Sequence, residues 1–242
     1  MNRGFGLGGI LLVAAGCAAA PVVDRGEVVR RILPSIVQLR VEREAGGRAA
    51  ASGVVFASDA ATARSWIVTT RHLLDSGAHQ RVYVRVPPGR ATLRASVVAT
   101  SPDADLAVLA VEGVVLPPVQ FREDARLGDE VWVVAFPWGR RLTVVSGVVS
   151  QIVAEAGETA VEGPAAMVDA SVSYGASGGG VFDAASGALI GIVEGYRTAR
   201  MVAPEARERA LEFPVPGETL LIPARAIRRF LGAAGLETLT PK

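Results

Sequence analysis

One stretch of the chain places a potential nucleophile between glycines. It runs from Asp169 to Gly180 and holds Ser177 between Gly175 and Gly178, with one alanine intervening. Glycine allows backbone conformations that are closed to other residues, so such a loop can present an exposed, activated serine. The same composition is also typical of an ordinary surface loop between two strands. The rest of the chain has to decide between these two interpretations.

A serine nucleophile needs a base, and the chain contains two histidines, His72 and His79. Ser177 also fits the Gly-x-Ser-x-Gly pattern of α/β-hydrolases, but in those enzymes the histidine follows the serine. No histidine follows Ser177, so that arrangement is excluded. His72 ends the apolar run 66–70, whereas His79 lies in a polar loop. Because a strand end holds a side chain more rigidly, His72 is the predicted base, although it could also be a packing residue.

The base in turn needs an acceptor that orients it. Asp103 and Asp105 both precede the apolar run 106–109, and Asp105 directly adjoins it. Asp105 is therefore the predicted acid. An aspartate before a strand is commonly a turn or cap residue, so this assignment depends on the residues around it.

Short strands must position these residues. Runs of apolar, β-branched or alternating residues are bounded by Gly, Pro or Asp, and predict strands at 36–41, 52–56, 66–70, 81–86, 92–98, 106–111, 131–135, 143–152, 167–172 and 189–194. Many short strands with almost no helix favour an all-β barrel or sandwich. Two helices are predicted as well. One is capped by Asp24 and runs through Ile32, and one spans Ala224–Leu231 with Pro223 in its first turn.

Composition limits the partners. The chain has 242 residues, half of them hydrophobic, which is enough for one large domain or two lobes sharing a cleft. A formal net charge of +1 argues against nucleic-acid binding. We expect neither a cofactor nor a metal ion.

The amino terminus resembles an export signal. Arg3 precedes an apolar run from Phe5 to Val13, and small residues then lead to Cys17, which predicts a signal peptide over residues 1–16. The run is nine residues, too short for a permanent membrane helix. The small residues before Cys17 resemble a bacterial lipoprotein box, so we predict an acylated Cys17 and a lipidated tether over 17–23. The alternative is an ordinary signal peptide with Cys17 incidental.

Five segments share the order and spacing of motifs in one known family. They are Trp66–His72, similar to Ile-Val-Thr-Asn-x-His; Asp105–Leu109, identical to Asp-Leu-Ala-Val-Leu; Gly128–Val131 with Phe136–Gly139, similar to Gly-x-x-Val and Asn-Pro-x-Gly; Val145–Ser150, similar to Thr-x-Gly-Ile-Val-Ser; and Asp169-Ala170 before Gly175–Gly179. On these segments, residues 35–231 resemble the Deg/HtrA type of bacterial trypsin-like serine protease.

The resemblance implies an all-β fold of two six-stranded antiparallel Greek-key barrels, with a short C-terminal helix. The barrels would span about 35–115 and 116–222 of a domain over 24–232, followed by a tail at 233–242. The catalytic residues would meet in the cleft between the barrels.

The resemblance also implies roles for the site residues. His72 would accept the proton of Ser177, Asp105 would hold the imidazole tautomer, and Ser177 would form an acyl-enzyme. Backbone N–H groups of Gly175 and Ser177 would form the oxyanion hole.

By position, the primary specificity pocket would be lined by five residues: Ser171, Val172, Ile192, Val193 and Glu194. No acid stands at the pocket base, so we expect cleavage after small or medium apolar residues. Glu194 would alter this preference if it pointed into the pocket.

The chain departs from the family pattern at three positions near the site. Arg71 replaces a small residue and adds a cation beside His72, Ala176 replaces Asn, and Gly180 replaces Pro. Gly180 is expected to make the nucleophile loop softer. Too few residues follow Leu231 for the family's PDZ module, so we do not expect one.

We therefore expect an exported serine endopeptidase that acts on unfolded or exposed polypeptide segments. Its lipid on Cys17 would anchor it to a bacterial envelope membrane, facing the periplasm. The alternative is a catalytically silent trypsin-like binding or scaffold lipoprotein, whose triad is present but never assembles.

Overall fold

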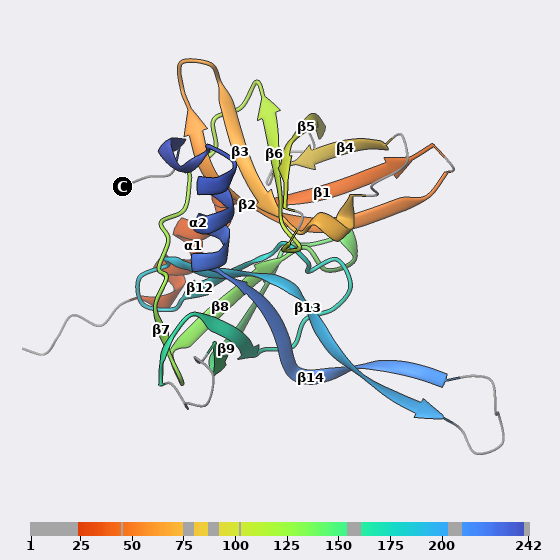
Figure 1. Ribbon diagram of the computed structural model, residues 1–242, viewed down its shortest axis with the longest axis vertical. Coiled ribbons are helices and arrows are strands. Elements are labelled where there is room, and N and C mark those ends of the chain that lie inside the picture. The colour runs from red at the N-terminus through yellow and green to blue at the C-terminus, as the bar shows by residue number, and fades with distance from the viewer. Residues whose placement is uncertain are drawn as a thin grey trace, which may run out of the picture.

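The computed structural model describes residues 24–44, 46–74, 80–86, 92–101, 103–153, 161–202 and 210–239. The predicted signal peptide, Cys17 with its tether, and His79 lie outside these ranges. Within them the chain forms two closed β-barrels, one above the other in Figure 1. Each barrel has six strands, and every strand pair in it is antiparallel, so the predicted fold class is confirmed.

The first barrel has the strand order β1-β2-β3-β6-β5-β4, and β4 closes it on β1. Its strands are β1 (Ile36–Arg43), β2 (Arg48–Asp59), β3 (Arg64–Thr69), β4 (Gln80–Arg85), β5 (Thr92–Thr100) and β6 (Ala107–Glu112). The alternation predicted for β4 is present, since Val82 and Val84 are buried while Arg81 and Arg85 are exposed. Successive side chains of a strand point to opposite faces, so this pattern turns the apolar residues inward.

The second barrel has the order β11-β14-β13-β12-β8-β9. Its strands are β8 (Glu130–Ala135), β9 (Thr143–Ile152), β11 (Ala165–Asp169), β12 (Gly180–Asp183), β13 (Leu189–Val202) and β14 (Ala210–Pro223); β7 (Ala125–Arg126) pairs separately with β10 (Glu162–Gly163). The outer halves of β13 and β14 leave the barrel as a two-stranded arm, at the lower right of Figure 1.

Two strands of this barrel were not predicted. β12 is only four residues long and begins within the glycine run at Gly180. β14 contains Pro214 and Pro216, and prolines argue against a central strand because they donate no backbone hydrogen bond. In β14 they lie in the arm, where one edge of the strand is unpaired in the described residues.

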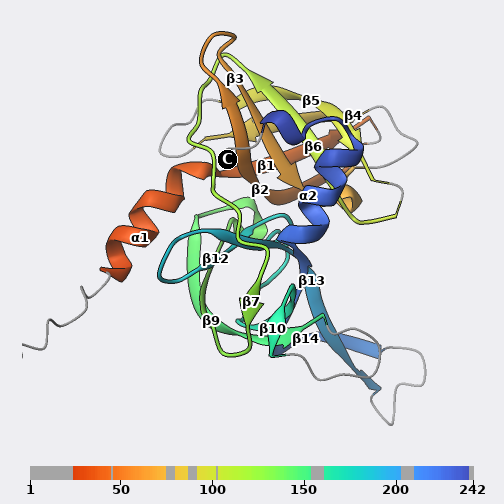
Figure 2. The ribbon, with the colours of Figure 1, turned by 60° about the vertical axis from the view of Figure 1, so that its left-hand side comes forward.

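Two helices flank the barrels (Figure 2). α1 (Arg25–Ile32) is capped by Asp24, whose side chain accepts hydrogen bonds from the N–H groups of the first turn, as predicted. α2 spans Ala224–Ala233 and is longer than expected, with Pro223 at the N-cap rather than inside the first turn. A 3₁₀ turn follows at Glu237–Leu239, within the predicted tail. Within the described part of the chain, no helix is long and apolar enough to cross a lipid bilayer.

A hydrophobic cluster joins the two barrels, in addition to the core inside each one. Its buried members include Val54, Phe56, Val68 and Leu106 from the first barrel, Val134, Phe182 and Ile192 from the second, and Ile227 and Leu231 from α2. Burying one such side chain contributes about 1.5–3 kcal/mol. The shared cluster therefore fixes the barrels against each other and holds the loops at their boundary in place.

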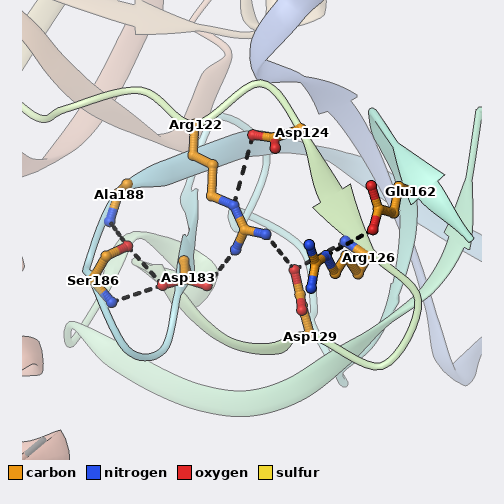
Figure 3. A network of polar contacts seen from close by, with 8 residues as sticks. All are labelled: Arg122, Asp124, Arg126, Asp129, Glu162, Asp183, Ser186 and Ala188. Carbon is orange, nitrogen blue, oxygen red and sulfur yellow. Dashed lines mark hydrogen bonds and ion pairs between the residues drawn. The ribbon is translucent and has the colours of Figure 1, made fainter.

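A polar network fixes the segment that connects the barrels (Figure 3). Arg122 donates to Asp183 Oδ2 at 2.6 Å and to Asp129 Oδ2 at 2.7 Å, and Asp124 lies 3.9 Å away. Burial alone would raise the pKa of Asp183, but hydrogen bonds from Ser186 and the charge of Arg122 outweigh it and lower that pKa. The network therefore holds this carboxyl in its ionised form.

Candidate active site

His72 and Asp105 meet at one end of the first barrel. Thr69 at the end of β3 pairs with Ala107 at the start of β6, so the residues just beyond both strands lie together. Asp105 Oδ1 accepts the backbone N–H of His72 at 2.7 Å, and Asp105 Oδ2 contacts the ring Nδ1 of His72. The His72 side chain is 52% exposed and that of Asp105 20%. The carboxylate thus orients the imidazole and leaves Nε2 directed away from it.

Arg71, the unusual neighbour of His72, is bound to the loop before Asp105. Its Nη1 donates to the carbonyl of Ser101 at 2.8 Å, and its backbone N–H donates to the carbonyl of Asp105 at 3.2 Å. The side chain therefore contributes to holding the Asp105 loop against the turn Arg71–Leu73 that carries His72.

The loop carrying Ser177 is packed against the same end of the first barrel. The carbonyl of Ser177 accepts the N–H of Ser52 at 2.8 Å. Gly178 has φ +77° and lies so close to Ser52 and Thr69 that a Cβ there would collide with both. Among the described residues no hydrogen bond joins Ser177 to His72. In enzymes without substrate this bond is often long or poorly aligned.

Gly180, which the sequence placed in the nucleophile loop, lies in a strand. It is the first residue of β12 and pairs with Ile192 on one side and Val134 on the other. Gly178 and Gly179 are also tied to β13, through bonds of 2.8 Å with Val193. Strand pairing begins directly after the nucleophile and restrains the glycines there.

The backbone at Gly175 is turned so that its N–H is available. The carbonyl of Tyr174 accepts the N–H of Trp138 at 2.6 Å, and because a peptide unit is trans, the N–H of Gly175 points the opposite way. Gly175 has φ +88°, and a Cβ there would lie 2.7 Å from the nitrogen of Trp138. In the described part of the chain, neither the N–H of Gly175 nor that of Ser177 has a protein acceptor. Since unpaired N–H groups at buried positions are rare, this pair is suited to bind an anionic oxygen.

Two aromatic side chains at this loop were not predicted. Trp138 is 63% exposed and Tyr174 48%, and their ring centroids lie 5.3 Å apart. Trp138 also has φ 57°, an uncommon backbone conformation for a residue other than glycine. Such strain concentrates at functional sites, so the outlier was a structural signal that the sequence did not contain.

The five residues predicted for the specificity pocket do not share one environment. Ile192 and Val193 have 0% exposure and belong to two different hydrophobic clusters, so their side chains offer no surface to a substrate. This corrects the expectation for those two side chains. Val172 packs against the second barrel's core, and Ser171 is exposed beyond the end of β11, which stops at Asp169 and not at the predicted 172.

Glu194 lies near enough to His72 and Asp105 for their charges to affect its pKa. It lies half-buried at an irregularity of β13, between Val193 and Gly195, and such bulges can re-aim a side chain. Burial raises the pKa of Glu194, the negative charge of Asp105 raises it further, and His72 opposes both. Within the described ranges, no group of three or more His, Cys, Asp or Glu side chains is arranged to hold a metal ion.

Comparison with known proteins identifies relatives of most of this chain. Residues 51–192 match the family of trypsin-like peptidase domains. A probable periplasmic serine endoprotease, DegP-like, of Pseudomonas fluorescens is 30% identical over 169 residues, which are 69% of this chain and 33% of that protein. Protease Do-like 1, chloroplastic, of Arabidopsis thaliana is 30% identical over 161 residues, which are 64% of this chain and 35% of that protein. The chain thus spans about a third of the length of these relatives.

Solved structures show the same fold. An HtrA-type protease, an AlgW variant with a tripeptide, superposes with a TM-score of 0.66 at 22% identity, covering 90% of this chain and 65% of that one. An inactive form of the Rv3671c protease from M. tuberculosis gives a TM-score of 0.64 at 23% identity, covering 93% and 98%.

Proposed function

Because the chain belongs to the trypsin-like peptidase family, we propose that it is a serine endopeptidase of the bacterial cell envelope that cleaves unfolded or exposed polypeptide segments. The observation that carries the proposal is the oriented His72 at the barrel end against which the Ser177 loop packs. The envelope location is supported by relatives that are named periplasmic endoproteases.

Acylation is the first chemical step. Ser177 Oγ attacks the carbonyl carbon of the scissile peptide, and His72 Nε2 takes the serine proton. Asp105, bonded to the opposite side of the ring, holds the tautomer and stabilises the imidazolium. The carbonyl oxygen becomes an oxyanion and is bound by the N–H groups of Gly175 and Ser177. Each such donor contributes about 3–4 kcal/mol in the transition state.

Collapse and deacylation complete the cycle. His72 returns its proton to the amine nitrogen, the C–N bond breaks, and the acyl group remains as an ester on Ser177. A water molecule then loses a proton to His72 and attacks the ester carbon. The carboxyl product leaves and Ser177 regains its hydrogen.

Substrate preference and anchoring complete the proposal. Cleavage follows small or medium apolar residues, because no acidic residue stands at position 171 to pair with a buried cation. Acylation of Cys17 would hold the domain at an envelope membrane. Intact-mass analysis of the mature protein tests the anchor: an added diacylglycerol on Cys17 is expected, and an unmodified terminus upstream or downstream of it contradicts it.

Replacing the nucleophile tests the activity. Ser177→Ala should reduce hydrolysis of unfolded casein to background, since removing the nucleophile of such a triad costs about 10⁶-fold in kcat. Far-UV circular dichroism and Tm should stay those of the wild type, because the hydroxyl makes no hydrogen bond among the described residues. Equal casein hydrolysis by the variant would refute the assignment.

A further inference from the structure

Ser52 belongs to the first barrel, but its side chain is bonded to the second. It lies in β2 with 0% exposure. Its Oγ donates to the carbonyl of Gly175 at 2.9 Å and accepts the backbone N–H of Phe136 at 2.8 Å. One buried hydroxyl therefore connects the two loops of the second barrel that surround the candidate oxyanion site.

These bonds restrain the most flexible residue of the loop. Glycine rotates more freely about its backbone than any other residue, and Gly175 adopts φ +88°. The peptide group before it is held by the bond from Trp138 N–H to the Tyr174 carbonyl, and the group after it by the bond from Ser52 Oγ. Because both flanking groups are held, the direction of the Gly175 N–H is fixed. Without the second bond, the glycine could turn that N–H away.

The same residue is connected to the strand that leads to His72. Thr69, the last residue of β3, donates its Oγ1 to the carbonyl of Ser52 at 2.8 Å. The backbone N–H of Ser52 donates to the carbonyl of Ser177 at 2.8 Å. Ser52 is thus bonded to the His72 strand, to the nucleophile and to the residue after Tyr174.

We propose that Ser52 is a positioning residue that holds the Gly175 N–H toward the oxyanion and so keeps the oxyanion hole assembled without an activator. The inference rests on the proposed function, because it assigns a role only if Ser177 is acylated. Ser52 touches no reacting atom; it acts through the peptide groups on which Gly175 depends.

A second serine of the first barrel offers a matched control. Ser65 in β3 is also 0% exposed. Its Oγ donates to the carbonyl of Val114 at 2.9 Å and accepts the N–H of Leu116 at 3.0 Å, so it bridges two backbone groups in the same way. Neither group belongs to the nucleophile loop. Ser65→Ala therefore leaves the same kinds of atoms unpaired away from the site.

The experiment compares Ser52→Ala with Ser65→Ala in the full chain. Initial rates with a p-nitrophenyl ester should show a fall in kcat of about tenfold to a hundredfold for Ser52→Ala and little change in KM. Deleting an oxyanion donor outright lowers kcat by about 10²–10³-fold, which is more than we expect for Ser52→Ala. Phenylboronic acid, which binds a serine nucleophile as a tetrahedral anion, should lose affinity by a similar factor. Ser65→Ala should retain kcat and boronate affinity. Its loss of Tm should be similar to that of Ser52→Ala.

A second variant keeps the inference testable if Ser52→Ala does not fold. Ser52→Cys fills nearly the same space with a weaker donor, so it should lose kcat to an intermediate degree. Casein should bind equally to Ser177→Ala with and without Ser52→Cys, because substrate binding does not require the oxyanion hole. Unchanged kcat in the folded Ser52 variants, or equal kcat losses in the Ser52 and Ser65 variants, would overturn the inference. Absence of activity in the wild type would instead refute the proposed function.

Discussion

The Arg122 network and the candidate active site both contain carboxylates, but their carboxylates contact different partners: a guanidinium in the network and an imidazole at the site. In the network, one guanidinium bonds to Asp129 and Asp183. At the site, Asp105 contacts the His72 ring, which is charged only when protonated. The charges of both residues affect the pKa of the half-buried Glu194. Similar side chains in one fold are thus placed in opposite electrostatic settings.

The pKa directions follow from this difference. Hydrogen bonds from Ser186 and the charge of Arg122 outweigh burial and lower the pKa of Asp183. Burial raises the pKa of Glu194, and the charge of Asp105 adds to it beyond the opposing effect of His72. The fold therefore favours the ionised form of one carboxyl and opposes that of the other.

The two carboxyls consequently make opposite contributions to stability. The lowered pKa of Asp183 gives a stabilisation that is present above the unfolded pKa of about 4 and is lost as the pH falls through the folded pKa. The raised pKa of Glu194 gives a cost that is absent below the unfolded pKa of about 4.3 and complete above the folded pKa. Opposed ionisation of this kind concentrates at functional sites. The Arg122 network and the candidate active site therefore differ in the direction of their carboxyl pKa shifts.

The largest expected effect is on activity at the site. Asp105→Asn should lower kcat by about 10⁴-fold, because the amide favours the wrong imidazole tautomer while keeping the shape of the side chain. Tm should change little. Steady-state kinetics and thermal unfolding check both parts, with Asp103→Asn in the same loop as the control, since Asp103 is exposed. An equal loss of activity in Asp105→Asn and Asp103→Asn would contradict the role assigned to Asp105.

The second effect should be on stability alone. Arg122→Met leaves Asp129 and Asp183 without their cation and should cost about 2–3 kcal/mol at pH 7, below the about 3–5 kcal/mol of a fully buried pair. The difference from wild type should shrink as the pH falls and Asp183 becomes protonated, while kcat at low temperature stays unchanged. Urea unfolding at several pH values measures this difference in the free energy of unfolding.

Arg126 provides the control for this measurement. Its ion pair with Glu162 is exposed, with side-chain exposures of 67% and 62%, so Arg126→Met should cost at most about 0.5 kcal/mol. A destabilisation by Arg122→Met that does not depend on pH would remove Asp183 from the explanation.

The smallest expected effect is a gain in stability rather than a loss. Glu194→Gln removes the opposed ionisation, so Tm at pH 7 should rise slightly, and the gain should disappear below about pH 4. Thermal unfolding at several pH values measures the gain, and the exposed Glu112→Gln should not show it. A fall in Tm at pH 7 for Glu194→Gln would contradict the cost assigned to its ionisation.

The sequence was sufficient to predict the positions of residues that lie at strand ends. His72 and Asp105 adjoin apolar runs that became β3 and β6, and pairing of those strands brings the two side chains together. The sequence could not reveal Ser52, because its partners are backbone atoms of residues 84 and 123 positions away, which leave no side-chain pattern. It also could not separate Ile192 and Val193 from a pocket, since apolar residues there fit a core equally well.

Labelling of Ser177 by a fluorophosphonate probe tests the central claim most directly. The probe forms a covalent bond only with a serine that an assembled base and oxyanion hole activate. The structure's oriented His72 and available Gly175 N–H predict stoichiometric modification of Ser177 in the wild type, located by peptide mass analysis, and none in Ser177→Ala. Folded wild-type protein that remains unlabelled under every condition would contradict the account and support a silent, protease-like binding protein.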